Sequence, residues 1–372
     1  MNKKCLVIFP TQLQVKIWQR YVHAYGLTVY ILLSHQVEID SQSNLHFITE
    51  EDVVSLSRTR LKVFCCSEAA IYWLKNHMSI FWQLQFMPEY LQMLNKIEFK
   101  QYAINKKLPV LPFWLKSNEL NEFPVIGKPS FGFASSGVSY LKDAIKAEEY
   151  ERNFNDVIKE SPIEKYRRIY FSDYENKCIF EPYIDGEFYR TPFVIDTCGN
   201  IITFPLRGIK RHDTSSKGFH WTDFICEDNC LELHALFNKI LTQVENVFHL
   251  LPGVYIAEFI VRKDKVYLVE FSPRLISDRL AWIVKAATGV DLEDLASALF
   301  IHSALGIKIN GIQKKFDIPE RRVVRLQIID SSSQIKSLDG FKLLETKQET
   351  NAYGKKVSCN LWVRNGEKIE TE

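Results

Sequence analysis

Apolar and polar positions over residues 1–94 follow two alternating patterns. Short continuous apolar runs predict buried strands, and these lie at residues 5–9, 28–33 and 61–65. Apolar residues at helical spacing predict helices, and these lie at residues 12–25, 68–76 and 83–94. Strands that alternate with helices are typical of a parallel sheet covered by helices. We therefore expect a small parallel α/β domain at residues 1–94.

Residues 253–274 have the pattern of a β-hairpin. Two runs rich in Val, Ile, Tyr and Phe flank a charged tip at residues 262–265. In the first run, alternation places Glu258 on a face that is otherwise apolar, and the opposite face is apolar too. A carboxylate in such a strand needs a compensating partner. On the return strand, alternation predicts Glu270 and Ser272 on one face together with Leu268.

The length of the hairpin tip decides whether the two acids meet. A regular two-residue tip places Glu258 opposite Val269 and sends the carboxylates to opposite faces. A three-residue tip, residues 263–265, places Glu258 opposite Glu270. Adjacent carboxylates repel unless a divalent cation lies between them, and Mg²⁺ is the natural candidate because it takes carboxylate and phosphate oxygens. The alternative is a pair of acids that face solvent at a sheet edge.

Two stretches between residues 95 and 138 each place a lysine at the end of a predicted element, one at a helix start and one at a strand end. Lys96 lies at the start of a predicted helix. Lys128 ends an apolar strand that runs into a loop of Gly, Ser and Ala at residues 130–137, which includes Ser135 and Ser136. Backbone N–H groups of such a loop can approach phosphate oxygens closely. The lysine precedes the glycines, so this is no Walker loop, and a plain hairpin loop is the alternative.

A third stretch, residues 178–189, contains a strand with a buried acid. Glu181 and Tyr183 lead into an Asp-Gly turn, and Glu187 begins the strand that follows. Its plain interpretation is a hairpin with solvated acids.

The C-terminal part is predicted to contain two helices followed by short strands. Apolar positions at helical spacing cover residues 279–288 and 292–305, with Asp291 as the N-cap of the second helix. Strand patterns around Asp-Gly and Asn-Gly turns cover residues 323–329, 341–344 and 357–363. We expect a small β element at residues 311–372.

Composition narrows the class of protein. The 372 residues are 46% hydrophobic and 25% charged, as in an ordinary soluble protein, and a net charge of +2 argues against a partner such as nucleic acid or a membrane surface. No apolar run is long enough for a membrane span or a signal peptide, so a cytoplasmic location is expected. The eight cysteines form no CxxC pair, and Cys226 and Cys230 match no zinc pattern.

The order of these stretches resembles the ATP-grasp superfamily, in particular its carboxylate–amine ligases of the amino-acid ligase type. The series is a lysine at a helix start, Lys-Pro-Ser before a glycine loop, Glu-x-Tyr-x-Asp-Gly-Glu, and a glutamate strand followed by Glu-x-Ser-Pro-Arg. The similarity covers about residues 95–305. It implies an α/β protein in which two α+β subdomains grip ATP at residues 95–310, with a hinge near 181–186, preceded by the parallel α/β domain.

The resemblance also implies a role for each matching residue. Lys96 and Lys128 would hold the ATP phosphates under the loop that contains Ser135 and Ser136, and Lys128 would also act in catalysis. Glu181 and Tyr183 would contact adenine, largely through backbone atoms, and Glu187 the ribose. The magnesium or manganese ligands would be Glu258, Glu270 and Ser272, and Arg274 would face the acyl phosphate.

The chain departs from the family's pattern at two places. Ser272 replaces the usual asparagine of Glu-x-Asn, and a shorter side chain would hold the metal less firmly. Residues 275–279 replace the glycines that often follow Pro-Arg, so the substrate pocket must differ.

The implied activity is an ATP-dependent ligase that activates a carboxylate as an acyl phosphate and joins it to an amine, with release of ADP and phosphate. The implied partners are small-molecule substrates, and because family members are often dimers, a homodimer is one expected assembly. Two alternatives stay open: a carboxylase that activates bicarbonate, and a degenerate protein that binds nucleotide without catalysis. The basic, turn-rich residues 204–221 would bind an anionic substrate or form a plain surface loop.

Overall fold

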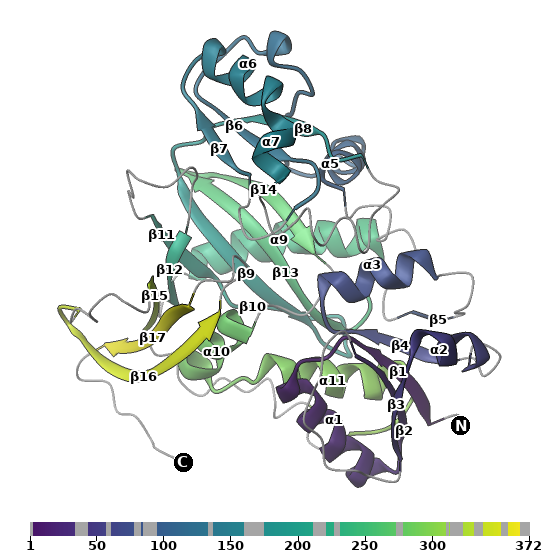
Figure 1. The fold of residues 1–372 in the computed structure, drawn as a ribbon. Helices are drawn as coiled ribbons and strands as arrows, with labels where there is room; N and C mark the ends of the chain where they lie inside the picture. Colours follow the sequence, from purple (N-terminus) through teal and green to yellow (C-terminus); the bar gives the residue numbers. More distant parts are fainter. Residues whose placement is uncertain are drawn as a thin grey trace.

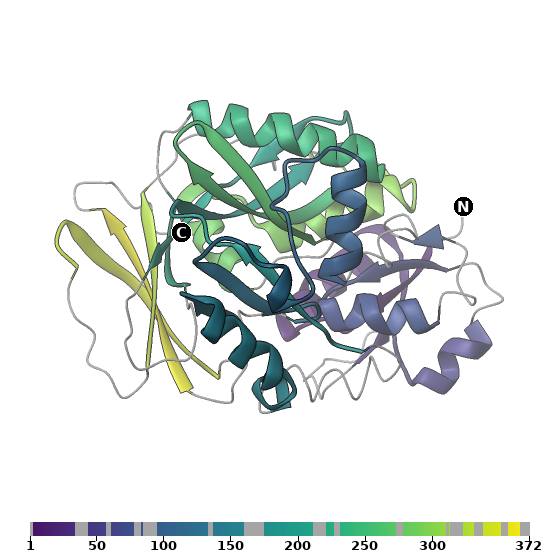
Figure 2. The same cartoon turned by 90° about the horizontal axis from the view of Figure 1, so that it is seen from above.

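The computed structural model describes residues 3–33, 44–56, 61–77, 83–84, 95–132, 137–159, 175–210, 221–226, 231–272, 278–309, 312, 323–330, 338–350 and 356–364. Figure 1 shows a small upper lobe above a large central sheet, with the N-terminal region at the lower right. In the view from above, strands near the C-terminus lie at the end of the molecule away from the N-terminal region (Figure 2).

The N-terminal region is a parallel sheet, as predicted. Within the described residues its order is β3 (Leu45–Ile48), β2 (Thr28–Leu32), β1 (Lys4–Ile8), β4 (Lys62–Cys65) and β5 (Gln83–Leu84), all pairs parallel. The helices are α1 (Gln12–Tyr25), α2 (Glu50–Leu56) and α3 (Glu68–Asn76).

Local signals explain the bounds of α1. Thr11 and Gln14 form a capping box at its start, and Gly26 takes a left-handed conformation at its end, with φ 61°.

The predicted helix at 83–94 is wrong at its start. Gln83 and Leu84 pair with Lys62 and Val63 in β5, because an open sheet edge outweighs a weak helical pattern, and residues 85–94 lie outside the described ranges.

The upper lobe contains a small antiparallel sheet. In the described part of the chain its order is β7 (Ser139–Leu141), β6 (Val125–Pro129) and β8 (Cys178–Pro182). It is accompanied by α5 (Lys96–Asn105), the 3₁₀ turn Ser117–Glu119, α6 (Ala144–Arg152) and α7 (Phe154–Lys159). Its core combines aliphatic and aromatic residues, and the rings of Tyr150 and Phe180 meet there edge to face.

The central sheet joins strands from distant parts of the chain. Among the described residues it has nine strands, in the order β14-β13-β9-β11-β12-β15-β17-β16, with β10 paired to β9. Their bounds are β9 Glu187–Ile195, β10 Ile201–Thr203, β11 Leu206–Lys210, β12 Trp221–Cys226, β13 Gly253–Arg262, β14 Lys265–Ser272, β15 Val324–Asp330, β16 Phe341–Thr350 and β17 Lys356–Arg364. The predicted C-terminal strands therefore extend the central sheet beyond β12.

Helices cover both faces of the central sheet. α9 (Leu231–Phe248) packs on the face that carries Phe259, whose ring stacks on Phe237 at 4.4 Å between centroids. α10 (Asp278–Thr288) and α11 (Leu292–Ser303) pack on the opposite face, which carries Val254 and Ile256. The predicted helices and the Asp291 cap are confirmed: the Asp291 side chain accepts a hydrogen bond from the backbone N–H of Asp294.

The N-terminal sheet and the central sheet share their cores. Trp18 of α1 is fully buried and meets Phe64 and Phe300 edge to face. The Tyr21 hydroxyl donates to Asp294 Oδ1 at 3.0 Å, and burial and the Asp294 charge raise the pKa of that hydroxyl.

Among the described residues, no helix is long and apolar enough to span a membrane. The boundaries at 94/95 and 310/311 stay predictions.

The hairpin β13–β14 combines the two predicted registers. Its tip has two residues, since Arg262 pairs with Lys265, yet Glu258 pairs with Glu270. A bulge between Glu258 and Phe259 reconciles these facts: Phe259 pairs with Leu268, so Val269 of β14 is the extra residue. The tip is therefore the two-residue alternative, and the acids pair through the bulge, which neither alternative included.

Because of the bulge, the prediction that Glu270 and Leu268 lie on the same face of the return strand is wrong. Leu268 and Phe271 both pack in the core beneath α9, because the extra residue between them shifts the alternation by one position. Glu270 consequently lies on the face opposite Leu268, where the prediction had placed both together.

Candidate nucleotide and metal site

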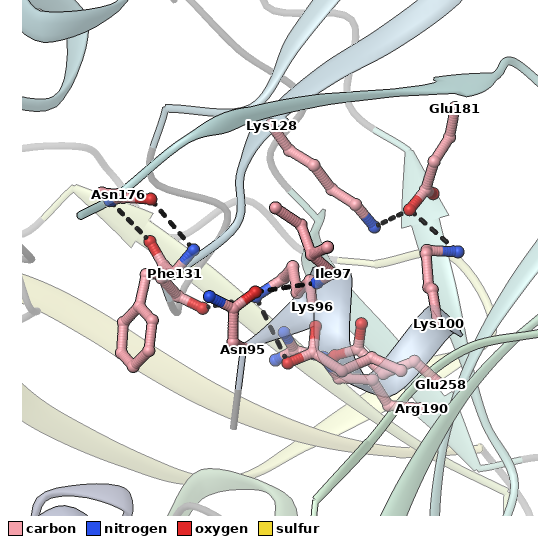
Figure 3. A network of polar contacts seen from close by, with 12 residues as sticks. Asn95, Lys96, Ile97, Lys100, Lys128, Phe131, Asn176, Glu181, Arg190 and Glu258 are labelled. Atoms are coloured by element: carbon pink, nitrogen blue, oxygen red, sulfur yellow. Dashed lines mark hydrogen bonds and ion pairs between the residues drawn. The ribbon is translucent and has the colours of Figure 1, made fainter. Parts of the chain in front are cut away.

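A buried group of three charges joins α5 to the small sheet. Glu181 Oε1 lies 2.7 Å from Lys128 Nζ and 2.9 Å from Lys100 Nζ, and all three side chains are almost fully buried (Figure 3). Glu181 pairs in register with Ile126, so it sits diagonally across from Lys128 on adjacent strands. Lys100 comes from α5, one turn after Lys96, and also donates to the Leu111 carbonyl.

The charges in this group set one another's ionisation. Burial opposes ionisation of Glu181, but the Lys100 and Lys128 ammonium groups outweigh it and hold its pKa below the usual value. Burial lowers the pKa of Lys100, and Glu181 only partly offsets this effect. The group ties β6, β8 and α5 together and presents Lys128 at the end of its strand.

Lys96 points from the start of α5 toward the glycine loop. Its Nζ donates to the Gly132 carbonyl at 2.8 Å and lies 3.5 Å from Glu270 Oε1. Asn95 caps the helix by accepting from the Ile97 N–H at 2.8 Å, and the Lys96 N–H donates to the Ser130 carbonyl. The helix start is thus fixed against the loop through backbone and side chain alike.

Both ends of the glycine loop are anchored. At its start, the Asn176 side chain accepts from the Phe131 N–H at 3.0 Å and donates to the Phe131 carbonyl at 3.1 Å (Figure 3). At its end, the Tyr150 hydroxyl donates to the Gly137 carbonyl at 2.7 Å, and Gly137 has a left-handed φ of 74°. Ser135 and Ser136 lie outside the described residues.

The two hairpin acids face each other between two cations. Glu258 and Glu270 are direct neighbours on β13 and β14. Arg190, directly opposite Glu258 on β9, donates from Nε to Glu258 Oε1 at 2.7 Å. Lys96 approaches Glu270 from the other side. Arg190 is therefore one compensating partner that the strand pattern around Glu258 demanded.

These residues suit a divalent cation. Two neighbouring carboxylates, with the Ser272 hydroxyl two positions along β14, supply the hard oxygen donors that Mg²⁺ prefers. Over the described ranges, no group of three or more His, Cys, Asp and Glu side chains is arranged to hold a metal. A metal here would thus take its remaining ligands from phosphate or water oxygens.

The remaining predicted residues lie along the hinge and beyond it. The Tyr183 N–H donates to the Pro124 carbonyl, and the Tyr183 hydroxyl lies 3.4 Å from Asp185 Oδ1. Glu187 at the start of β9 accepts from the Tyr189 hydroxyl at 3.0 Å and lies 3.6 Å from Arg207 Nη1. Arg274 and residues 211–220 lie outside the described residues.

Sequence reasoning missed three residues of this site. Lys100 could have been found, because it follows Lys96 by four positions and so shares its helix face. Arg190 and Asn176 carried no signal, since their positions depend on strand pairing and loop packing between distant segments.

Comparisons with known proteins identify the class. Residues 121–281 match the family model of the ATP-grasp domain. The match to the ATP-grasp domain thus holds for this segment, and the α/β architecture described above is the ATP-grasp fold, as predicted. No curated protein sequence matches the chain.

Three solved structures illustrate the likeness of fold. An L-amino acid ligase from Bacillus licheniformis has a TM-score of 0.67 and 15% identity, over 98% of this chain and 94% of that chain. The biotin carboxylase domain dimer of a 2-oxoglutarate carboxylase from Hydrogenobacter thermophilus, with MgADP and bicarbonate, has 0.64 and 14%, over 97% and 86%. An N5-carboxyaminoimidazole synthetase from Staphylococcus aureus, with ADP, has 0.62 and 14%, over 98% and 95%.

Proposed function

We propose that this protein is an ATP-dependent ligase that joins a carboxylate to an amine through an acyl phosphate. The observation that carries the proposal is the meeting of Lys96, at the start of α5, with the acid pair of β13 and β14. That contact brings a lysine suited to binding phosphate and a carboxylate pair suited to binding a metal into one site. The site lies beside the anchored glycine loop. The L-amino acid ligase of similar fold supports the choice of reaction.

In the proposed site, each residue acts on a different part of ATP. The backbone of the hinge at 181–186 holds adenine, with Glu181 and Tyr183 at its start, and Glu187 binds the ribose. Lys96 and Lys128 neutralise phosphate charge, and the loop with Ser135 and Ser136 covers it. The side chain of Glu181 is committed to the lysines, so it orients Lys128 and leaves adenine to backbone atoms.

Glu258, Glu270 and Ser272 would hold Mg²⁺ or Mn²⁺ through their oxygens. When bound, the cation would neutralise phosphate charge and polarise the phosphoryl oxygens. Arg274 would face the carboxylate substrate and the acyl phosphate.

The reaction needs no nucleophilic side chain. A carboxylate oxygen attacks the γ-phosphorus, the bond from that phosphorus to the β–γ bridging oxygen breaks, and ADP leaves. The amine nitrogen then attacks the acyl carbon, phosphate leaves with the acyl oxygen, and the nitrogen loses a proton. Closure of the loop would keep water from the acyl phosphate.

The test is release of ADP from ATP and Mg²⁺ in the presence of pools of amino acids. We expect release that depends on one pool, with an amide product seen by mass spectrometry. ADP release with bicarbonate and no amino acid would instead favour a carboxylase, a candidate suggested by the bicarbonate-bound neighbour. Nucleotide binding without ADP from any pool would favour the non-catalytic alternative.

We also propose a homodimer, because the carboxylase domain of similar fold is described as a dimer. Sedimentation at several protein concentrations tests this assembly, and a monomer throughout would contradict it.

A further inference from the structure

Strand β16 lies at the outer edge of the central sheet. It pairs with β17 on one side, and no strand of the described residues pairs with its other side (Figure 1). Residues 342–348 of β16 are all exposed, and they include Leu343 and Leu344, which are 38% and 39% exposed. A long exposed edge strand presents backbone N–H and C=O groups that can pair with a strand of another chain.

The ladder of β16 is regular over its second half. Lysines and bulges on an edge strand usually discourage pairing with another chain, and β16 has both. Its bulge lies at Leu344, between the pairs that Leu343 and Glu345 form with β17. From Glu345 onward the pairing with β17 is unbroken, so residues 345–350 offer a regular edge, and the charges on it decide which strand fits.

The pairing of β17 determines which residues of β16 direct their backbone to the open edge. Arg364 donates its N–H to the carbonyl of Val323, next to β15, so the backbone of Arg364 faces away from β16. Backbone direction alternates along a strand, so Asn360 faces β15 as well. Asn360 pairs with Thr346, and this pair therefore exchanges no hydrogen bonds within the β16–β17 ladder. Thr346 consequently directs its N–H and C=O to the open edge.

Two opposite charges flank Thr346 on the strand. Glu345 accepts a hydrogen bond from Trp282 Nε1 at 3.0 Å, and Lys347 Nζ lies 4.1 Å from the centre of the Trp282 ring. The charged atoms of Glu345 and Lys347 are 3.8 Å apart, and their side chains are 48% and 46% exposed. Trp282 of α10 thus holds a carboxylate and an ammonium side by side at the edge, where both can reach a neighbouring strand.

A second copy of β16 complements these charges when a two-fold axis passes through Thr346. The two strands then run antiparallel, Thr346 lies opposite Thr346, and each Glu345 lies opposite the other copy's Lys347. The outward N–H and C=O groups of the two Thr346 residues exchange two hydrogen bonds at the axis. An axis through Glu345 or through Lys347 would instead place like charges opposite each other, which is destabilising.

An axis through Gln348 is less favourable for two reasons. It would place Lys347 opposite Glu349, but it pairs residues 346–350 alone, whereas the axis through Thr346 pairs residues 342–350. Glu349 also accepts from Arg279 Nε at 2.6 Å, so its carboxylate already has a cation within its own chain.

We propose that β16 is a dimer surface, at which a second copy of this chain adds its own β16 antiparallel, with Glu345 of each copy opposite Lys347 of the other. The contact joins the two central sheets into one and covers Leu343 and Leu344, which lie toward the ends of the shared ladder. It specifies the surface of the homodimer proposed above and depends neither on ATP nor on the ligase reaction.

The test exchanges the two charges and measures mass by sedimentation velocity at several protein concentrations. The unsubstituted protein should be a dimer. Lys347→Glu and Glu345→Lys should each be monomeric at concentrations at which the unsubstituted protein is dimeric, because each variant places two pairs of like charges across the axis. An equimolar mixture of the two variants should form a heterodimer, since every glutamate then faces a lysine, and a heterodimer also shows that both variants fold.

Lys146→Glu is the matched control. The Lys146 side chain is 51% exposed and also forms an ion pair with a nearby glutamate, Glu149, but it lies on α6, away from the edge. This variant should stay dimeric. The inference is overturned by a monomeric unsubstituted protein, by a single variant at Glu345 or Lys347 that stays dimeric, or by a mixture that stays monomeric.

The outcomes separate this surface from the homodimer and ligase proposals. A dimer that persists through both charge changes refutes the β16 surface and leaves the homodimer standing. A monomer at every concentration refutes the homodimer and the β16 surface together, and ADP release still decides the ligase independently.

Discussion

At the scale of single residues, the site depends on charges that compensate one another within a few ångströms. Glu181 is the clearest case, since a buried carboxylate would be costly without Lys100 and Lys128. Glu258 and Glu270 repeat the arrangement at the edge of the central sheet, with Arg190 and Lys96 as their cations. Removing one member of such a group leaves its buried partners without a compensating charge, and burial of an uncompensated charge is destabilising.

We predict that Glu181→Gln lowers the free energy of unfolding by about 3–5 kcal/mol, the usual cost of breaking a buried ion pair. Lys100 and Lys128, both buried, then lose the carboxylate that forms ion pairs with them, and urea unfolding measures the loss. Glu149→Gln is the control, because Glu149 forms an exposed ion pair with Lys146 and should shift the urea midpoint little. Equal shifts in both variants would contradict the assignment.

The same glutamate predicts a dependence of stability on pH. The folded pKa of Glu181 is lowered, so its stabilisation is fully present above its ordinary pKa of 4.5. That stabilisation is lost as the pH falls from there through the lower folded pKa. Urea unfolding between pH 6 and pH 3 should therefore show a smaller fall in stability for Glu181→Gln than for the unsubstituted protein. Parallel pH profiles would argue against this role.

We predict that Glu270→Gln abolishes turnover while the fold is kept, because it removes a carboxylate oxygen from the proposed metal position. Steady-state ADP release measures the loss, and circular dichroism with a thermal melt checks the fold. An unchanged rate would refute the metal assignment.

At the scale of elements, the site is built where a helix start, a loop and a hairpin meet. α5 begins at Lys96 because Asn95 caps it, and the glycine loop is held by Asn176 at one end and Tyr150 at the other. The bulge at Val269 keeps Leu268 and Phe271 in the core while Glu270 turns to the site. The cap that starts α5 also directs Lys96 toward the site, and the bulge that keeps Leu268 and Phe271 in the core also directs Glu270 there.

Asn176→Ala should weaken nucleotide binding about tenfold or more with little change in the thermal midpoint, because the start of the glycine loop loses its side-chain hydrogen bonds. Calorimetric titration with an ATP analogue measures the affinity. Asn246→Ala is the control, since Asn246 bonds only to Thr242 of its own helix among the hydrogen bonds described. Unaltered affinity in Asn176→Ala would show that the anchor is dispensable.

At the scale of the whole molecule, the N-terminal sheet and the central sheet form a continuous structure. Buried residues of α1 and β4 lie in the same cluster as those of α10 and α11. Gln14 and Tyr21 add polar contacts to Glu293 and Asp294. The region before the candidate nucleotide site is therefore part of the body that supports β13.

We predict that Trp18→Ala destabilises the whole protein by about 3–5 kcal/mol, because a fully buried ring between Phe64 and Phe300 is lost. Urea unfolding followed by circular dichroism and by hydrogen exchange should show both sheets losing structure at one midpoint. Separate transitions for residues 1–94 and for the central sheet would contradict a shared core.

The sequence by itself determined most of the elements and the kind of chemistry. Helix bounds at Gln12 and Leu292 follow from caps written within a few residues, and the strands of the first sheet follow from short apolar runs. The order of lysine, glycine loop and paired acids pointed to the ATP-grasp fold that the family model confirms. Signals of this kind lie within short stretches of sequence, so they can be recognised without the tertiary structure.

Only the tertiary structure decided how the charges meet. The register of β13 against β9 and β14 depends on a bulge and on packing beneath α9, which no local pattern encodes. That register brings Arg190, 68 positions away in the chain, onto Glu258. Long-range ion pairs depend on where two separately folded strands come to lie, and that position is a property of the whole core.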